Sequence, residues 1–277
     1  MTVNPPAAAP LLEAHRLSKA FSGVRALDDY ALRLAPLSIH GVIGPNGAGK
    51  TTLFNLLTGF LTPTTGTIRL EGRNITGQPA DRVARLGLVR TFQNIRLFGQ
   101  LSVIENVKTT LQSQSPVSLL GTLVSSPSFL RCERALEHGA QDLLDRVGLA
   151  ARRDQIARSL PYGDQRRLEI ARAVALNPKI LMLDEPNAGM NQAETAELLR
   201  LIRRLRDELK ITIIMVAHDI PLVMNLCDQI QVLNYGRLIA EGDPAAVRNN
   251  PEVIAAYLGS KSGVRSQESG VRSQESE

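Results

Sequence analysis

Tryptophan is absent from the chain, and cysteine and aromatic residues are scarce. Cys132 and Cys227 lie far apart without metal-ligand spacing, so we expect reduced thiols rather than a disulfide or zinc framework. No apolar run approaches the roughly 20 residues that span a bilayer, and the longest lies within 211–217. The first ten residues lack the basic and apolar segments of a signal peptide. We therefore expect neither a channel nor an exported protein.

Neither sign of charge is scarce, but basic residues are in excess. The 277 residues carry a formal net charge of +5, and the sequence pI is about 9.5. Such a chain suits acidic partners, namely nucleotide, an anionic membrane face or nucleic acid. Arginines cluster at 152–172 and 200–206, and we interpret most of them as solvated helix faces. The length allows one domain with a large core.

The most informative stretch is a glycine-rich loop at 44–52. It has the spacing G-x-x-x-x-G-K-[ST] of a P-loop, whose backbone N–H groups surround nucleotide phosphates. Lys50 can reach the outer phosphates, and the Thr51 hydroxyl can ligate Mg²⁺. Contacts with a nucleoside triphosphate are therefore expected from Gly44, Pro45, Asn46, Gly47, Ala48, Gly49, Lys50, Thr51 and Thr52.

The sequence around this loop fits a bound phosphate. Residues 41–43 are apolar and predict a short buried strand before the loop. Residues 50–57 have leucines at helical spacing and predict a helix after it. The N-terminus of that helix would add its partial positive charge at the phosphates.

Patterns along the chain predict an α/β fold. Residues 11–34 alternate in places, as antiparallel strands do. About 93–164 reads as an inserted helical subdomain, after which helix and strand alternate over 165–245. The first ten residues and the segment 260–277 have no apolar periodicity. We expect a loose leader and a disordered tail there.

Three apolar strands end in residues that can bind phosphate or react. One leads into the P-loop, the second ends in Asp184-Glu185, and the third ends in His218-Asp219. Ligands bind beyond the carboxyl ends of strands in open parallel sheets. If the three strands are parallel neighbours, these groups converge on one γ-phosphate.

Each of these groups has a chemical role to offer. Asp184 follows four apolar residues, where a carboxylate is costly unless it is paired or near a metal, and Mg²⁺ is its natural partner. Glu185 suits the base that activates the attacking water. His218 can hydrogen-bond the γ-phosphate and orient the water, although a lone histidine is often structural. The Gln93 amide can ligate Mg²⁺ or hold that water.

The order of these motifs resembles that of the ATP-binding subunits of ABC transporters, over about residues 11–259. The resemblance implies a P-loop, RecA-like, mostly parallel sheet with an N-terminal antiparallel β subdomain and the helical insert. It also implies ATP as the nucleotide. Phe21 would stack on adenine, although a core phenylalanine fits as well. The signature loop, which meets the ATP of a partner subunit, would be formed by Leu160, Pro161, Tyr162, Gly163 and Asp164.

Three further runs, at 90–98, 162–172 and 256–259, are similar to the LivG-type ATPases of branched-chain amino acid importers. This similarity implies transport of leucine, isoleucine and valine. Related importers of urea or amides have similar ATPases and stay open as an alternative.

The resemblance also implies an assembly. Two ATPase subunits would sandwich two ATPs, and the second subunit is expected to be a sister chain. Two integral membrane permeases would dock at the helical subdomain, and a periplasmic binding protein would take part indirectly. This places the chain at the cytoplasmic face of the inner (plasma) membrane, with no nucleic acid among its partners.

The sequence departs from the general family pattern in places. The family signature begins Leu-Ser-Gly-Gly-Gln, so Pro161 removes a hydroxyl and an N–H donor. Asp164 puts negative charge near the loop, and Asn191 stands where an aspartate is usual. Gly163 keeps a backbone role, just before a helix that we expect to begin near Gln165.

Two other classes of nucleotide-hydrolysing protein fit the sequence less well. A non-transport ABC ATPase, for repair or translation, usually carries a second P-loop or a long coiled-coil insertion, and the sequence has neither. A regulatory GTPase would need an Asn-Lys-x-Asp motif to recognise guanine, and that motif is absent.

Overall fold

The computed structural model describes residues 9–114 and 127–257, so the segment 260–277 and most of the expected leader lie outside the described residues. The described residues form two compact units. Those within 1–80 and 212–277 form the first, which we call the P-loop unit. Those within 81–211 form the second, which we call the helix-rich unit.

The P-loop unit contains an antiparallel sheet with the strand order β2-β1-β4-β5. Its strands are β1 (Leu12–Phe21), β2 (Val24–Leu34), β4 (Thr65–Leu70) and β5 (Arg73–Asn74). Leu12 of β1 lies opposite Leu34 of β2 on one side and Leu70 of β4 on the other. The antiparallel strands expected at 11–34 are thus confirmed.

The same unit holds strands of a second, mostly parallel sheet, which carries the P-loop. They are β3 (Ile39–Ile43), β8 (Thr212–Val216), β9 (Gln229–Asn234) and β10 (Arg237–Gly242). β3 pairs in parallel with β8 and with β9, and β10 is antiparallel to β9. Every residue of β3 and β8 is buried, as continuous apolar runs predict for a parallel sheet.

Short helices follow these strands. They are α1 (Lys50–Leu57), α8 (Ile220–Leu226) and α9 (Pro244–Arg248). The bounds of α1 confirm the helix expected after the loop. Its leucines at 53, 56 and 57 are buried, so the apolar spacing marked a core-facing helix.

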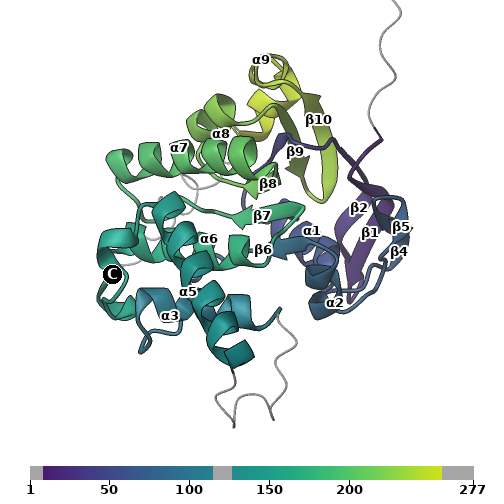
Figure 1. Ribbon diagram of the computed structural model, residues 1–277. Helices are drawn as coiled ribbons and strands as arrows, with labels where there is room; N and C mark the ends of the chain where they lie inside the picture. Colours follow the sequence, from purple (N-terminus) through teal and green to yellow (C-terminus); the bar gives the residue numbers. More distant parts are fainter. Residues whose placement is uncertain (1–8, 115–126, 258–277) are drawn as a thin grey trace, which may run out of the picture. The chain divides into compact units, whose positions relative to one another are not determined.

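The helix-rich unit has the parallel pair β6 (Leu88–Arg90) and β7 (Ile180–Asp184). Its helices are α2 (Ala80–Arg85, which begins at the unit boundary), α3 (Val103–Gln112), α5 (Pro127–Val147), α6 (Tyr162–Ala175) and α7 (Gln192–Leu209). Two short 3₁₀ helices, η1 (Ala150–Arg152) and η2 (Ala157–Ser159), precede α6. α3, α5 and α6 pack against one another (Figure 1).

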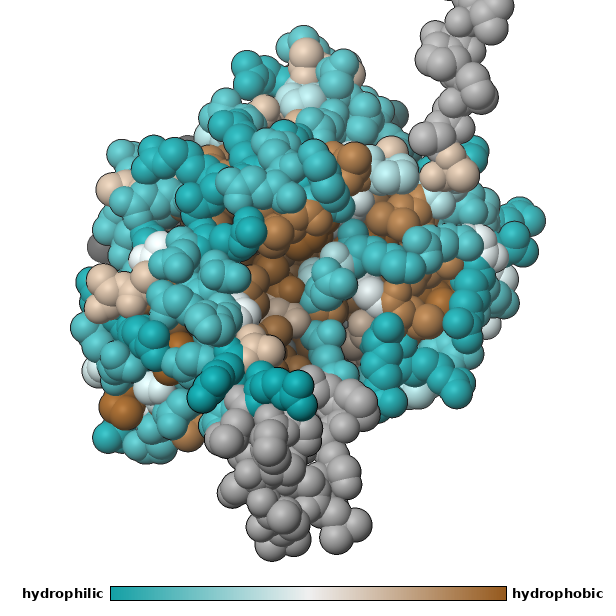
Figure 2. Space-filling model, viewed as in Figure 1, coloured by the Kyte–Doolittle hydropathy of each residue, from teal (hydrophilic) through white to brown (hydrophobic). Residues whose placement is uncertain are grey.

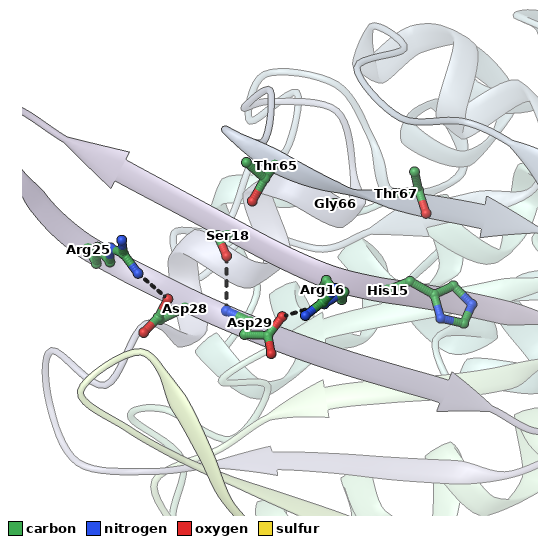
Figure 3. Close-up of a pocket in the computed structure, with 9 residues that line it drawn as sticks. All are labelled: His15, Arg16, Ser18, Arg25, Asp28, Asp29, Thr65, Gly66 and Thr67. Atoms are coloured by element: carbon green, nitrogen blue, oxygen red, sulfur yellow. Dashed lines mark hydrogen bonds and ion pairs between the residues drawn. The ribbon is translucent and has the colours of Figure 1, made fainter.

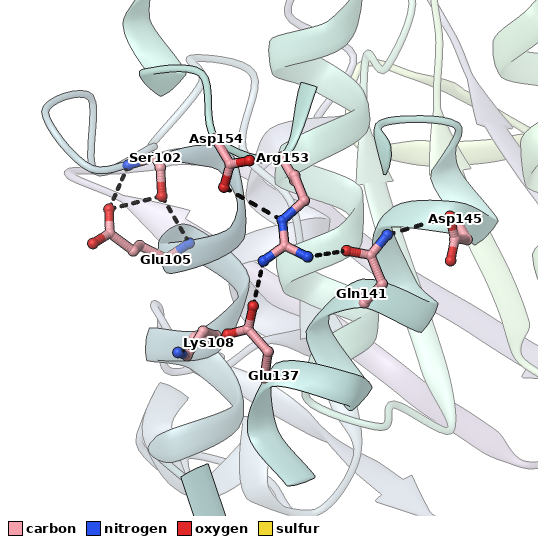
Figure 4. A network of polar contacts seen from close by, with 8 residues as sticks. All are labelled: Ser102, Glu105, Lys108, Glu137, Gln141, Asp145, Arg153 and Asp154. Atoms are coloured by element: carbon pink, nitrogen blue, oxygen red, sulfur yellow. Dashed lines mark hydrogen bonds and ion pairs between the residues drawn. The ribbon is translucent and has the colours of Figure 1, made fainter. Parts of the chain in front are cut away.

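Polar contacts fix the segment that leads into η2. Arg153 donates to Gln141 at 2.9 Å and pairs with Glu137, so the loop is tied to α5 (Figure 4). Lys108 of α3 pairs with the same Glu137 at 2.9 Å. The pairs are partly exposed, and they stabilise the fold modestly.

Most of the surface seen in Figure 2 is hydrophilic, with apolar side chains in smaller patches. In α7, for example, Leu198, Leu201, Ile202 and Leu205 are buried while the arginines lie outside this set. Within the described residues, no helix has both the length and the apolar character needed to cross a bilayer.

Candidate nucleotide-binding and catalytic site

The P-loop is shaped by glycines in left-handed conformations. Gly47 has φ 77° and Gly49 has φ 104°. A Cβ on Gly49 would lie 2.5 Å from the carbonyl oxygen of Ala26, so backbone packing also requires glycine there. Gly49 is the N-cap of α1 and offers no side chain to the N–H groups of the first turn. This leaves a helix N-terminus suited to an anion.

Lys50 is poised at the loop. Its side chain is buried, and its Nζ donates to the carbonyl oxygens of Gly44 at 2.7 Å and Pro45 at 2.9 Å. A phosphate oxygen is a stronger, charged acceptor for the same ammonium group. Thr51, the next residue, is exposed.

A cavity of about 650 Å³ opens beside the loop. Part of its lining is Gly44, Pro45, Asn46 and Ala48, and His218 is part of the same lining. The parallel pairing of β3 and β8 brings this about, because both strands end at the same sheet edge. The expected meeting of the first and third strand ends is confirmed.

The carboxyl-terminal part of the chain contributes the rest of this lining, which the sequence had not indicated. Tyr235 and Tyr257 line the cavity, and the Tyr257 hydroxyl contacts the backbone of Gly44. Burial raises the pKa of Tyr257 to about 12, so the hydroxyl stays a neutral hydrogen-bonding group. Asp219, beside His218, caps α8 by accepting from the Leu222 N–H at 3.1 Å.

Phe21 ends strand β1, and its ring is 44% exposed. The alternative of a core phenylalanine is therefore excluded. Lys19 Nζ lies 5.1 Å from the ring centroid. Phe21 is not among the described residues that line the 650 Å³ cavity. Its contact with adenine therefore stays a prediction.

A second hollow of the P-loop unit, about 590 Å³, lies on the antiparallel sheet (Figure 3). Its charged groups are paired with one another. Asp28 accepts from Arg25 at 2.8 Å and also from Arg237, which holds the pKa of Asp28 below its usual value. Asp29 pairs with Arg16 at 3.4 Å. Because its charged side chains are already paired, this hollow is a weaker candidate for a catalytic site than the cavity beside the P-loop.

In the helix-rich unit, Asp184 ends β7 and is 6% exposed. Its Oδ2 accepts from Arg90 Nη2 at 2.6 Å. The expectation that this carboxylate depends on a metal for its partner was therefore incomplete, because Arg90 already compensates its charge. The available signal was a basic residue directly after the apolar Leu88-Val89 of β6.

Glu185 follows with φ 46°, a left-handed backbone that places a non-glycine residue under strain. Its Oε2 accepts from Gln93 Nε2 at 3.0 Å. The structure thus brings together two side chains that the sequence proposed separately. A carboxylate and an amide in contact can hold one water molecule between them and a phosphate.

The signature segment begins differently from the expectation. α6 starts at Tyr162, not near Gln165, so Gly163 lies inside the first turn. Pro161 is the N-cap with φ −53°, and proline suits a helix start because the N–H groups there have no intrahelical partner. Leu160 is buried and Tyr162 is 42% exposed.

Asp164 does not leave an uncompensated negative charge. It pairs with Arg152 at 3.1 Å and with Arg167 at 3.6 Å. Asn191 is the N-cap of α7, where it forms a capping box with Glu194. Asn and Asp cap helices about equally well, so the local structure accepts this departure from the family pattern.

The residues expected at a metal were Thr51, Gln93 and Asp184. They offer hydroxyl, amide and carboxylate oxygens, which are the donors that Mg²⁺ prefers. Among the described residues, no group of three or more His, Cys, Asp and Glu side chains could hold a metal. A nucleotide-borne Mg²⁺ needs only one or two protein oxygens, so the donor set fits that kind of site.

Comparisons with known proteins agree with this geometry. The chain matches the ABC transporter family over residues 27–188 and the branched-chain amino acid ATP-binding cassette transporter family over 237–261. It is 48% identical over 250 residues to the high-affinity branched-chain amino acid transport ATP-binding protein LivG of Escherichia coli K12, covering 90% of this chain and 98% of that one. It is 45% identical to BraF of Pseudomonas aeruginosa PAO1, with the same coverage.

Solved structures give the same result. The ADP conformation of MJ1267, an ATP-binding cassette of an ABC transporter, superposes with a TM-score of 0.78 at 29% identity, covering 90% of this chain and 99% of that one. The α/β fold class and the family expected from the motifs are therefore confirmed. The chain belongs to the ABC transporter family, as one of its ATP-binding subunits.

Proposed function

We propose that this chain is the ATP-hydrolysing subunit of an importer of branched-chain amino acids. The observation that carries the proposal is the cavity shared by the P-loop and His218. A terminal phosphate bound in this cavity would have backbone N–H groups and an imidazole as neighbours. The choice of leucine, isoleucine and valine rests on the relatives named for that transport and on the match at 237–261.

The chain's own groups divide the work. Lys50 and the N-terminus of α1 would bind and orient the phosphates of ATP, and Phe21 would stack on adenine. Glu185, held by Gln93 at 3.0 Å, would take a proton from the attacking water. His218 would orient the γ-phosphate. Catalysis of this kind consists mainly of positioning and charge stabilisation.

Mg²⁺ would accompany ATP, with Thr51, Gln93 and Asp184 as its nearest protein groups. When bound, it neutralises charge on the phosphates as the terminal bond breaks. Asp184 is kept in place by Arg90 at 2.6 Å.

We propose one ABC ATPase domain at 11–259, with a helical subdomain at about 93–164. The helices α3, η1 and η2 and the described part of α5 fall inside that interval. A second ATPase subunit would supply its signature loop to this chain's ATP, and residues 160–164 would do the same in return. Two permeases would dock on the helical subdomain at the cytoplasmic face of the membrane.

Two substitutions test the ATPase. Glu185→Gln removes the base but not the phosphate contacts, so phosphate release should fall by about 10²- to 10⁴-fold with ATP affinity retained. Lys50→Ala is the matched variant, and it should lose ATP binding itself. Equilibrium binding of a fluorescent ATP analogue and phosphate release measure the two properties. Unchanged hydrolysis in Glu185→Gln would remove Glu185 from the proposal.

A separate experiment tests the solute. The chain is purified in complex with its permeases and second ATPase subunit, and the complex is reconstituted in vesicles with the cognate binding protein. Leucine should stimulate ATP hydrolysis and be taken up. Stimulation by urea and not by leucine would contradict the proposed solute and leave the ATPase assignment standing.

A further inference from the structure

Arg166 is a fully buried arginine with four acceptors around its guanidinium group. It lies in the first turns of α6, where we had expected arginines to be solvated. Its Nη1 donates to the Phe92 carbonyl at 2.7 Å, and its Nη2 donates to the Gln93 carbonyl at 2.8 Å. Nη1 also donates to Glu169 Oε2 at 2.7 Å, and Nη2 to the Tyr162 hydroxyl at 3.3 Å.

Glu169, the ion-pair partner of Arg166, binds the same backbone segment. Glu169 lies one turn along α6, and its Oε1 accepts from the Phe92 N–H at 3.3 Å. The segment Phe92-Gln93 is thus held through two carbonyls and one N–H. Burial raises the pKa of Glu169, and the adjacent Arg166 charge opposes that rise. A planar guanidinium can serve several acceptors at fixed angles, which a lysine ammonium cannot do as rigidly.

Arg166 and Glu169, with the backbone of Phe92-Gln93 that they bind, form what we call the clamp. The clamp adjoins the candidate base. Gln93 has its backbone fixed to α6 by Arg166, while its side chain donates to Glu185 at 3.0 Å. A shift of the Gln93 backbone would therefore displace the amide from the carboxylate. At the other end, the clamp reaches Tyr162, a partly exposed residue of the signature segment.

We propose that Arg166 is a positioning residue for ATP hydrolysis, which acts by fixing Gln93 against Glu185 and linking that contact to the signature helix. The inference rests on the proposed function, because it takes Glu185 as the base. Arg166 and Glu169 themselves are not among the residues proposed to contact ATP. Arg166 should therefore affect turnover and leave ATP affinity unchanged.

A buried ion pair can also serve stability alone, and the variants are chosen to separate the two roles. Arg166→Met alone leaves the buried Glu169 carboxylate without its cation and can prevent folding. Arg166→Met with Glu169→Met removes both charges at similar volume and should fold. In this double variant kcat should fall about 10- to 100-fold, as misplacement of a catalytic group does. The Kd for ATP should stay within about twofold.

Conservative replacement adds a second readout. Arg166→Lys keeps the charge beside Glu169 but not the fork that reaches both carbonyls. Its melting temperature should return toward that of the parent, with kcat still low. Full recovery of kcat together with the melting temperature would show that Arg166 serves stability only and would overturn the inference.

The decisive measurement is a double-mutant cycle that combines the Arg166 substitution with Gln93→Ala. If Arg166 acts through Gln93, its removal should have little further effect on kcat once the Gln93 amide is gone. Losses that multiply would show independent action and overturn the inference.

Arg153→Met is the matched control, since Arg153 also bonds several acceptors in the same unit, namely Gln141, Glu137 and Asp154, and Gln93 is not among them (Figure 4). It should lower the melting temperature without lowering kcat. An equal loss of kcat in Arg153→Met would contradict a specific role for Arg166. Failure of Glu185→Gln to slow hydrolysis would instead remove the proposed function, so the two failures are distinguishable.

Discussion

The P-loop unit holds its functional groups mainly by backbone, whereas the helix-rich unit holds them by charged side chains. The conformation at Gly49 is constrained by a left-handed φ and by a carbonyl oxygen that would lie 2.5 Å from any added Cβ. Asp184 is held by an ion pair of 2.6 Å, and Gln93 is held by the guanidinium group of Arg166. Backbone geometry is rigid and sensitive to shape. Side-chain networks are sensitive to charge, and they can rearrange.

The comparison predicts its largest effect on ATP affinity at Gly49. Gly49→Ala combines a positive φ with a collision against the Ala26 carbonyl, so the loop must deform. ATP affinity should fall by at least about 100-fold, or roughly 2.7 kcal/mol. Gly47→Ala is the matched variant, because its Cβ would meet nothing within 4 Å. Its loss of ATP affinity should reflect only the strain of an alanine in a left-handed conformation, about 1–2 kcal/mol.

Gly163 extends this test to the helix-rich unit. An added Cβ there would lie 3.1 Å from Glu194 Oε1, the end of a flexible side chain. Gly163→Ala should therefore fold normally and bind ATP like the parent, as measured by thermal melting and equilibrium binding. Equal losses of affinity at Gly49, Gly47 and Gly163 would refute the contrast between the units.

A second prediction concerns the Arg90–Asp184 pair. Both side chains are nearly buried, so Arg90→Met leaves a carboxylate without its cation. The free energy of unfolding should drop by about 3–5 kcal/mol in urea titrations. Adding Asp184→Asn should restore most of it. Arg146→Met, which breaks an exposed pair with Glu208, should cost less than about 1 kcal/mol.

If Arg90→Met cost no more than Arg146→Met, charge pairing would not be what holds the end of β7. The side-chain half of the comparison would then fail, while the backbone half would be untouched.

Local sequence predicted the backbone half well. The P-loop and α1 follow from glycine positions and leucine spacing within a short window, and β3 and β8 follow from continuous apolar runs. His218 could be placed near the loop because parallel strands end at one edge. These inferences need only neighbours in sequence and a rule about sheets.

Of the side-chain half, Asp184, Glu185 and Gln93 were predicted, but neither the arginines that hold them nor their contacts were. Glu185 and Gln93 were both named, yet their contact joins residues far apart in the chain. Arg166 and Glu169 have the i,i+3 spacing of an exposed helix pair, and only tertiary packing buries them. The start of α6 at Tyr162 was missed because a proline N-cap signals a helix start only weakly.

The prediction with the smallest effect at neutral pH concerns His40, which lies in β3 just before the P-loop. Burial lowers its pKa to about 4, and of the described groups none bonds its Nε2. Because the unfolded chain binds this proton near pH 6.5 and the folded chain only near pH 4, stability is full above pH 6.5 and falls as pH decreases toward 4. The loss should approach about 3 kcal/mol. In urea titrations across this range, His40→Gln should remove most of the slope, since glutamine does not titrate. An unchanged slope in His40→Gln would assign the acid sensitivity to other groups and show that the strand beneath the P-loop tolerates a buried charge.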